Sequence, residues 1–215
     1  MSQDRQLQEA VLAEFAWEPS INAAHIGVIA DAGIVTLTGH VANYLEKHAA
    51  AVAATRVKGV KGVVQEMEVR IHFSAERSDE EIARVAIDHL IWDVSVPANA
   101  IKVRVEKGWV TLSGEVEWHF QKEAAERAVR GLYGVVGISD LTTIKQKPDA
   151  VNISADINTA LHRSWFDPDK VKVTATGGKV KLTGTVHSSS ERWTAGSTAW
   201  GAPGATSVEN DLIVA

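Results

Sequence analysis

Histidines and paired acidic residues are the side chains of this chain that could bind a metal ion or transfer protons. The eight histidines form no HExxH or HxH motif, and short fixed spacings of this kind are typical of metal sites. The acidic pairs Glu80/Glu81 and Glu115/Glu117 fit a helix start and outward strand positions. The chain also has no GxSxG, Walker or GxGxxG motif. The sequence therefore predicts no catalytic centre, no metal site and no cofactor, and we expect a protein that is not an enzyme.

Basic residues alternate with apolar ones in two segments, and this pattern could bind anions. Successive side chains of a strand point to opposite faces, so the lysines of residues 170–182 are expected to share the outward face of a sheet. A weaker version of the pattern lies in residues 102–107. One interpretation is a solvated face that lysine keeps soluble; the other is a docking patch for anionic headgroups, at about 1 kcal/mol per basic residue. The candidate residues for an anionic surface are Lys170, Lys172, Lys179, Lys181, Lys102, Arg104 and Lys107.

Seven tryptophans form a second group of candidate binding residues. Trp17, Trp92 and Trp165 occur at corresponding places in three segments, which predicts core or hinge anchors. Trp109 and Trp118 do not recur in this way, and we expect them at an exposed interface. Tryptophan is favoured at protein interfaces and at the level of lipid headgroups. Partial burial between neighbouring domains is the alternative.

A glycine pattern that occurs three times organises the chain. Residues 35–41 (VTLTGHV), 110–116 (VTLSGEV) and 180–186 (VKLTGTV) are near copies of one another. A second glycine lies six residues before the central glycine of each copy. The glycines with an expected structural role are Gly33, Gly39, Gly108, Gly114, Gly178 and Gly184. This recurrence predicts a tandem array of three domains, at residues 1–75, 76–147 and 148–215.

A GxxG sequence follows the central glycine in each copy. The separation between the two is 20, 17 and 17 residues, which predicts a three-residue insertion in the first copy. A GxxG loop can clamp a nucleic-acid backbone, but there it joins two helices, whereas here it precedes a strand. Helix C-caps explain the three glycine pairs more simply. The pairs are Gly59/Gly62, Gly131/Gly134 and Gly201/Gly204.

Each copy has the pattern of helix, strand, strand, helix, strand. In the second copy, residues 78–81 (SDEE) form a capping box before apolar residues at helical spacing. Residues 101–105 and 110–116 alternate as the two strands of a hairpin, and Gly108 supplies the positive φ of its turn. Gly114 falls on the apolar phase of the second strand, which predicts a helix packed closely across it. The predicted fold is α+β, with three tandem small αββαβ units, each a mixed three-stranded sheet with two helices on one face.

The third copy departs from this pattern in its second helix. Residues 194–204 (TAGSTAWGAPG) have poor helix propensity, so we expect that helix to be short or loose. A degenerate terminal repeat is the simpler interpretation, and a mobile binding edge is the other.

Composition excludes several classes of protein. The chain has 22 basic and 27 acidic residues and a net charge of −5, which argues against nucleic-acid binding. It has no cysteine, and no apolar segment long enough for a membrane span. Its first residues lack the basic and apolar regions of a secretory signal, which predicts a cytoplasmic chain.

The three glycine motifs, each with a hairpin before it and an alanine-rich helix after it, resemble the BON domains of bacterial osmotically inducible and nodulation-associated proteins. The resemblance covers nearly the whole chain. It implies a bacterial origin, an αββαβ unit, no catalytic centre, and a role in envelope or osmotic stress through binding of phospholipid or protein. It also implies a periplasmic location if a leader precedes the chain.

Two functions follow from these expectations. The first is a non-enzymatic, stress-associated protein that contacts anionic phospholipid or envelope proteins through its sheet faces and tryptophans. The alternative is a soluble, chaperone-like module whose three units offer multivalent weak contacts to other proteins.

Overall fold

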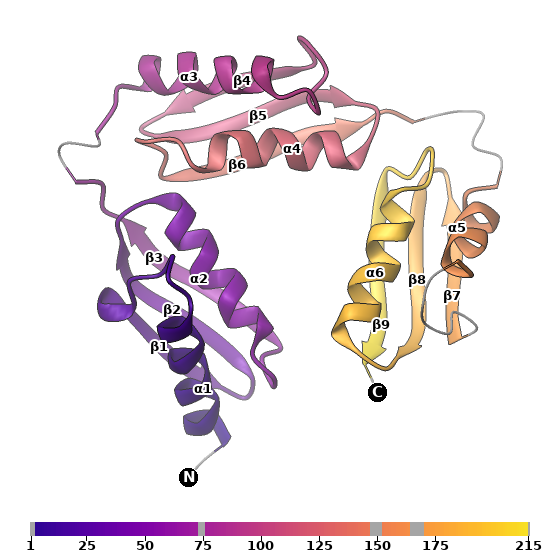
Figure 1. Cartoon of the computed structure of the whole chain (residues 1–215), viewed down its shortest axis with the longest axis horizontal. Helices are drawn as coiled ribbons and strands as arrows, with labels where there is room; N and C mark the ends of the chain where they lie inside the picture. Colours follow the sequence, from indigo (N-terminus) through magenta and orange to yellow (C-terminus); the bar gives the residue numbers. More distant parts are fainter. Residues whose placement is uncertain (1–2, 73–75, 147–151, 164–169, 215) are drawn as a thin grey trace. The chain divides into compact units, whose positions relative to one another are not determined.

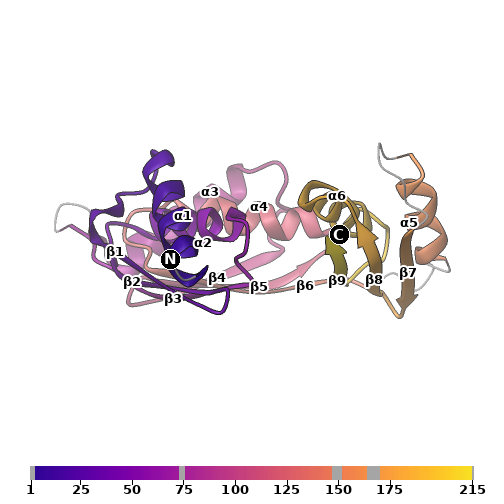
Figure 2. The same ribbon diagram turned by 90° about the horizontal axis from the view of Figure 1, so that it is seen from below.

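The structure is a computed structural model, and it describes residues 3–72, 76–146, 152–163 and 170–214. The first repeat consists of helix α1 (Gln3–Trp17), the short helix η1 (Ala23–His25), strands β1 (Ile26–Asp31) and β2 (Ile34–Val41), helix α2 (Tyr44–Arg56) and strand β3 (Gly62–Val69). Strand β2 lies in the centre of the sheet, antiparallel to β1 and parallel to β3. Both helices cover one face of this sheet (Figures 1 and 2).

The other two repeats have the same order of elements. The second contains α3 (Asp79–Trp92), β4 (Ile101–Glu106), β5 (Trp109–Val116), α4 (His119–Arg130) and β6 (Gly137–Ile144). The third contains α5 (Ile153–Leu161), β7 (Val171–Thr176), β8 (Lys179–Val186), α6 (Ser189–Trp200) and β9 (Ser207–Val214). Each forms a three-stranded sheet with its middle strand in the centre. The predicted fold class, three tandem αββαβ units with helices on one face, is confirmed.

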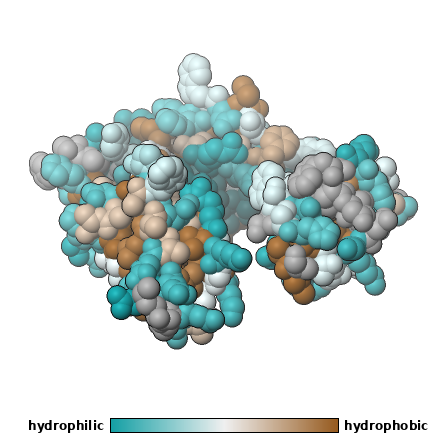
Figure 3. Space-filling model, turned by 60° about the horizontal axis from the view of Figure 1, so that its bottom comes forward, coloured by the Kyte–Doolittle hydropathy of each residue, from teal (hydrophilic) through white to brown (hydrophobic). Residues whose placement is uncertain are grey.

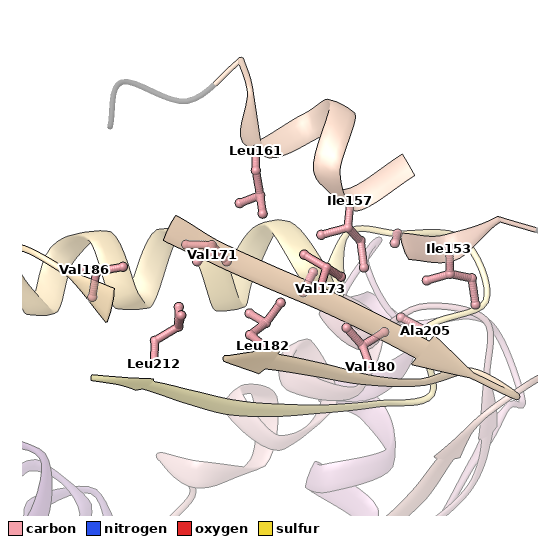
Figure 4. Packing of buried hydrophobic residues seen from close by; sticks show 13 residues of the cluster. Ile153, Ile157, Leu161, Val171, Val173, Val180, Leu182, Val186, Ala205 and Leu212 are labelled. Atoms are coloured by element: carbon pink, nitrogen blue, oxygen red, sulfur yellow. The ribbon is translucent and has the colours of Figure 1, made fainter. Parts of the chain in front are cut away.

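Each core lies between the helices and the covered face of the sheet. In the third repeat, Ile157 and Leu161 of α5 point toward strands β7 and β8 (Figure 4). The residues at two-residue spacing on β8 are buried, as the predicted alternation requires. The predicted capping box of α3 is also present, because Glu81 accepts a hydrogen bond from the Ser78 N–H at 2.9 Å and Ser78 Oγ accepts one from the Glu81 N–H at 3.2 Å.

The central glycine of each repeat lies against backbone, not against a helix. Gly39 has φ +97°, and a Cβ atom there would collide with the carbonyl oxygen of His25, the residue before β1. Gly114 and Gly184 have the same relation to the residues before β4 and β7, Ala100 and Lys170. The expected close packing of a helix at these glycines is therefore wrong. The close neighbour is the chain as it enters the antiparallel first strand, which pairs Ile26 with Gly39.

A third glycine recurs at a constant spacing in all three repeats. Gly59, Gly134 and Gly204 have φ values of +98°, +87° and +86°, and each lies 20 residues after the central glycine. The expected insertion in the first copy is wrong, because the three GxxG pairs are not in register. Gly59 is the first glycine of its pair, but it corresponds to Gly134 and Gly204, which are the second glycines of theirs. The turn after the second helix needs one positive φ, and the other glycine of each pair is outside this requirement.

Of the paired glycines, Gly201 is the C-cap of helix α6, as the sequence suggests, but Gly59 and Gly204 are not C-caps. The C-cap of α2 is Val57, two residues before Gly59, and the C-cap of α6 is Gly201 with a negative φ of −74°. The glycine with positive φ instead brings the following residues to the hairpin turn. The Lys61 N–H donates to the Gly33 carbonyl at 2.8 Å, and the Thr206 N–H donates to the Gly178 carbonyl at 2.8 Å.

Helix α6 is complete, so the expectation of a short or loose helix in the third repeat is wrong. It spans 12 residues, and its N-cap is Ser188, whose side chain accepts the Glu191 N–H. Ala195 and Ala199 are fully buried, and Asn210 of β9 donates to the Arg192 carbonyl at 2.9 Å. Tertiary packing therefore outweighs the low helix propensity of this segment.

A buried glutamate joins the second helix to the central strand in the first repeat. Glu46 is 6% exposed, and its carboxylate accepts the Asn22 N–H at 2.7 Å and the Ala42 N–H at 2.9 Å. Gln121 holds the corresponding position in the second repeat, and Glu191 in the third accepts the His187 N–H at 2.7 Å.

Replacing Gly39 with alanine is expected to destabilise the first repeat by about 3 kcal/mol, because the new Cβ collides with the His25 carbonyl and the positive φ is unfavourable for alanine. Gly62→Ala is the matched control, since Gly62 has no positive φ and nothing lies within 4 Å of a Cβ there. Chemical denaturation followed by amide NMR signals of the first repeat measures both. Equal stability of the two variants would contradict the proposed role of Gly39.

Removing the Glu46 carboxylate is expected to destabilise the first repeat in proportion to the N–H groups left without an acceptor. Glu46→Ala leaves both N–H groups without an acceptor and lowers the free energy of unfolding by about 2 kcal/mol or more. Glu46→Gln retains one acceptor oxygen and lowers it by about half as much. Urea denaturation of the wild type and the two variants tests this order. The role of the carboxylate is wrong if the alanine variant is as stable as the glutamine variant.

Candidate binding surface

The face of each sheet opposite its helices is the surface on which the predicted basic residues lie. In the third repeat, Lys172 and Lys179 are exposed and alternate with buried Val171, Val173 and Val180. Strand β7 pairs with β8 so that Lys172 is opposite Thr183 and Thr176 is opposite Lys179. Lysine and threonine side chains thus cover the β7 and β8 part of this open face, which we call the lysine face.

Lys181 differs from the other lysines because two acidic residues bind it. Its ammonium lies 2.7 Å from Asp211 Oδ2 and 3.1 Å from Glu209 Oε1, both on strand β9. The hydrogen bond to Asp211, then that to Glu209, raise the pKa of Lys181 above its ordinary value of 10.5. Lys181 therefore stays protonated, and the two carboxylates compensate its charge. Lys170, Lys172 and Lys179 are the exposed cations of the lysine face.

The two acidic residues that form ion pairs with Lys181 were not predicted from the sequence. β8 and β9 are parallel, with Lys181 opposite Glu209 and Thr183 opposite Asp211. The two-residue spacing of Glu209 and Asp211 in β9 (SVENDLIV) is the signal that could have placed them on one face.

The second repeat has a weaker basic face. Lys102 and Arg104 are exposed on β4, and Arg104 forms an ion pair with Glu106 at 2.8 Å. Lys107 lies in the hairpin turn with φ +51°, and its N–H donates to Asp79 Oδ2 at 2.7 Å. The Lys107 side chain is exposed while its backbone serves the fold.

Trp109 lies on the open face of the second repeat and is 46% exposed. Its indole Nε1–H donates to Ser139 Oγ on β6 at 2.9 Å. Its ring covers Gly137, where a Cβ atom would collide with three of the ring carbons. Trp118 is half-buried, and its N–H donates to Gln121 Oε1 at 3.0 Å at the start of α4.

Trp17 and Trp92 are exposed, which contradicts their predicted role as core anchors. They are 86% and 84% exposed at the ends of α1 and α3. Phe15 is buried, and a residue two positions further along a helix points about 200° away from it. Trp165 lies outside the described residues. Figure 3 shows apolar patches in brown that are separated by hydrophilic residues in teal.

No cluster of three or more histidine, cysteine or acidic residues that could hold a metal ion occurs among the described residues. His25 and His40 stack with ring centroids 4.6 Å apart in the first repeat, without a third ligand. Within the described ranges, no helix has the length and apolar character needed to cross a membrane.

Three copies of one α+β fold, each with an open sheet face, define a tandem-repeat protein. Residues 3–71, 78–146 and 149–215 each match the BON domain family. The chain therefore belongs to the BON domain family, as the glycine motifs predict.

A curated relative matches part of the chain. The osmotically-inducible protein Y of Escherichia coli (strain K12) is 32% identical over 127 residues, which are 55% of this chain and 63% of the relative. This chain therefore spans less than two thirds of the length of that relative.

Two solved structures match the chain with low TM-scores. CdsD, a structural protein of the type III secretion system of Chlamydia trachomatis, is 18% identical, with a TM-score of 0.27 over 98% of this chain and 93% of CdsD. The PrgH periplasmic domain is 11% identical, with a TM-score of 0.23 over 88% of this chain and 95% of that domain.

Removing the acidic partners is expected to lower the pKa of Lys181 toward 10.5, because their hydrogen bonds favour its charged form. In the wild type, the stabilisation that this pair gives is complete below the ordinary pKa and is lost as the pH rises through the raised one. An NMR titration of the Lys181 side chain in the Glu209→Gln, Asp211→Asn double variant measures the change. The Glu209→Gln single variant retains Asp211, so its Lys181 pKa should lie between those of the wild type and the double variant. An unchanged midpoint in the double variant would contradict this account.

Proposed function

We propose that this chain is a non-enzymatic, stress-associated binding protein that contacts anionic phospholipid through the lysine face. Its membership of the BON family and its similarity to an osmotically-inducible protein support a role in stress. The contact belongs at the surface of a bacterial membrane, as the family resemblance implies. The protein contributes binding and no chemical step.

One observation carries the lipid proposal, the exposed cations on an open sheet face. Lys172 and Lys179 point away from the core, and Lys170 is exposed just before the first strand of that face. Each basic residue near an anionic membrane surface contributes about 1 kcal/mol, and the attraction falls off within a Debye length of about 8 Å at physiological salt. Binding should therefore be weak, reversible and sensitive to salt.

Glu209 and Asp211 set the limit of this attraction. They compensate Lys181 at 3.1 Å and 2.7 Å and place negative charge on the same face. The lysine face is therefore a moderate attractor for anions, and binding through it should need a surface that offers many headgroups at once.

Exposed aromatic residues favour a second candidate function, binding of other proteins. Trp17, Trp92 and Trp193 are 86%, 84% and 72% exposed, and tryptophan is enriched at the centres of protein interfaces. A chaperone-like module with three weak sites would use such residues.

Reversing the charge of Lys172 and Lys179 is expected to abolish flotation of the full chain with vesicles of phosphatidylglycerol and phosphatidylcholine at low salt. The wild type should float with these vesicles, lose binding at high salt, and not bind phosphatidylcholine alone. Glu209→Gln with Asp211→Asn should strengthen binding, because it removes the negative charge of the same face.

The matched control is Lys58→Glu with Lys61→Glu, which changes the net charge equally at exposed residues of the first repeat. Equal loss of flotation in both double variants would contradict a role of the lysine face and leave net charge as the cause. Absence of flotation in the wild type, together with suppressed aggregation of a denatured protein, would overturn the lipid proposal in favour of the second candidate.

A further inference from the structure

The open face of the second repeat carries a fixed aromatic surface at Trp109. The face is formed by the outward residues of β4, β5 and β6, with β5 in the centre. Trp109 begins β5, and its indole reaches over the neighbouring strand β6. We call the exposed side of this ring the Trp109 platform.

Two contacts fix the orientation of the ring. The hydrogen bond from Nε1–H to Ser139 Oγ, at 2.9 Å, prevents the indole from turning about its side-chain bonds. The ring also occupies the space above Gly137, which only a residue without Cβ leaves open. One side of the ring therefore lies against the sheet, while 46% of the residue remains accessible. A ligand that stacks on this ring would not need to order it first.

This orientation does not suit insertion into a membrane. An indole that anchors at headgroup level extends away from the protein surface, with its apolar part toward the acyl chains. Trp109 would have to break its bond to Ser139 and leave the sheet to do so. The platform is thus distinct from the lysine face in what it can bind.

The charges around the platform do not favour a cation. Aromatic sites for ammonium groups depend on the negative face of the ring and gain from nearby carboxylates. Here the neighbouring carboxylate of Glu106 is bound to Arg104 at 2.8 Å, and Lys107 is exposed in the turn just before Trp109. The Glu106 carboxylate is therefore already paired and is not available to a cation that stacks on the ring.

Polar groups that can hydrogen-bond a neutral ligand lie on the same face as the ring. The Ser139 hydroxyl accepts the indole N–H and keeps its own hydrogen for a ligand oxygen. Thr111 lies two residues after Trp109 on the same face and is partly exposed. The Arg104–Glu106 pair adds a donor and an acceptor on the adjacent strand β4.

We propose that the Trp109 platform binds a pyranose ring of a neutral, β-linked oligosaccharide. Such rings present axial C–H groups on flat faces, which pack against the negative face of an indole, and equatorial hydroxyls at their edge, which need polar partners. Both requirements meet here, in a fixed ring with the Ser139 hydroxyl at its edge and in the Arg104–Glu106 pair on the adjacent strand of the same face. This binding goes beyond the lipid contact and uses another face.

The other two repeats supply natural controls for this position. Residues 34, 109 and 179 correspond to one another in the repeat spacing, and they are isoleucine, tryptophan and lysine. Position 139 corresponds to Val64 and Glu209, so the partner of the indole N–H is also absent from the other copies. The fold accommodates isoleucine at this position, and Trp109→Ile therefore tests the ring without a collision in the sheet.

The experiment is an NMR titration with chitotetraose of the full chain, in which the tryptophan side chains are labelled. The indole Nε1–H signal of Trp109 should shift in a saturable way, while that of Trp193, which is 72% exposed but lies on a helix, should not. Trp109→Ile should reduce the affinity by about tenfold or more. Ser139→Ala, which retains the ring and removes one of the two contacts that fix its orientation, should weaken binding by a smaller factor.

Several outcomes would overturn the proposal. These are no shift of Trp109 at millimolar saccharide, equal shifts of Trp109 and Trp193, and saccharide binding by Trp109→Ile as tight as that of the wild type. A stronger response of Trp109 to choline or to a thymidine oligonucleotide than to chitotetraose would also overturn it, since the platform would then serve a cation or a nucleobase. Amide spectra of each variant show whether the repeat is folded, and vesicle flotation of Trp109→Ile should be unchanged.

Discussion

In each repeat, the central strand can lie against the start of the first strand only because a glycine faces the carbonyl oxygen there. Gly39 shows the constraint: its φ of +97° turns the strand locally, and the His25 carbonyl occupies the place of a side chain. The antiparallel register on one side and the parallel register on the other both pass through this residue, opposite Ile26 and Met67. The order of the three strands therefore depends on a backbone contact that tolerates no Cβ.

The remaining constraints hold the second helix to that central strand. Glu46 accepts two backbone N–H groups, one of them just after β2, and its own N–H donates to the Asn43 side chain at 2.8 Å. The corresponding residues Gln121 and Glu191 accept N–H groups in the same way. Because these interactions all lie on the helix side of the sheet, they leave the opposite face free to vary. The residues of the open face differ between repeats for this reason, while the glycines and the helix-start residues recur.

The elements of the fold follow from local patterns, which is why they could be predicted. The alternation around Leu112 and the capping box at Ser78 each depend on residues a few positions apart. The errors concern contacts between distant residues. The neighbour of Gly39 is 14 positions away, at His25, and packing against Asn210 completes helix α6 despite its poor propensity.

The candidate surface was predictable only in its outline, for the same physical reason. Alternation places Lys172 and Lys179 on one face, and both are exposed there. Whether a lysine is free or bound depends on the register of a parallel strand 28 residues away, as Lys181 and Glu209 show. The fixed orientation of Trp109 likewise depends on a serine 30 residues later.

One outward position holds isoleucine, tryptophan and lysine in the three repeats, so the open faces offer apolar, aromatic and cationic groups in turn. A ligand that engaged all three in the same way would need the same group at each, and the array is therefore better suited to different partners on a shared scaffold than to one partner bound three times.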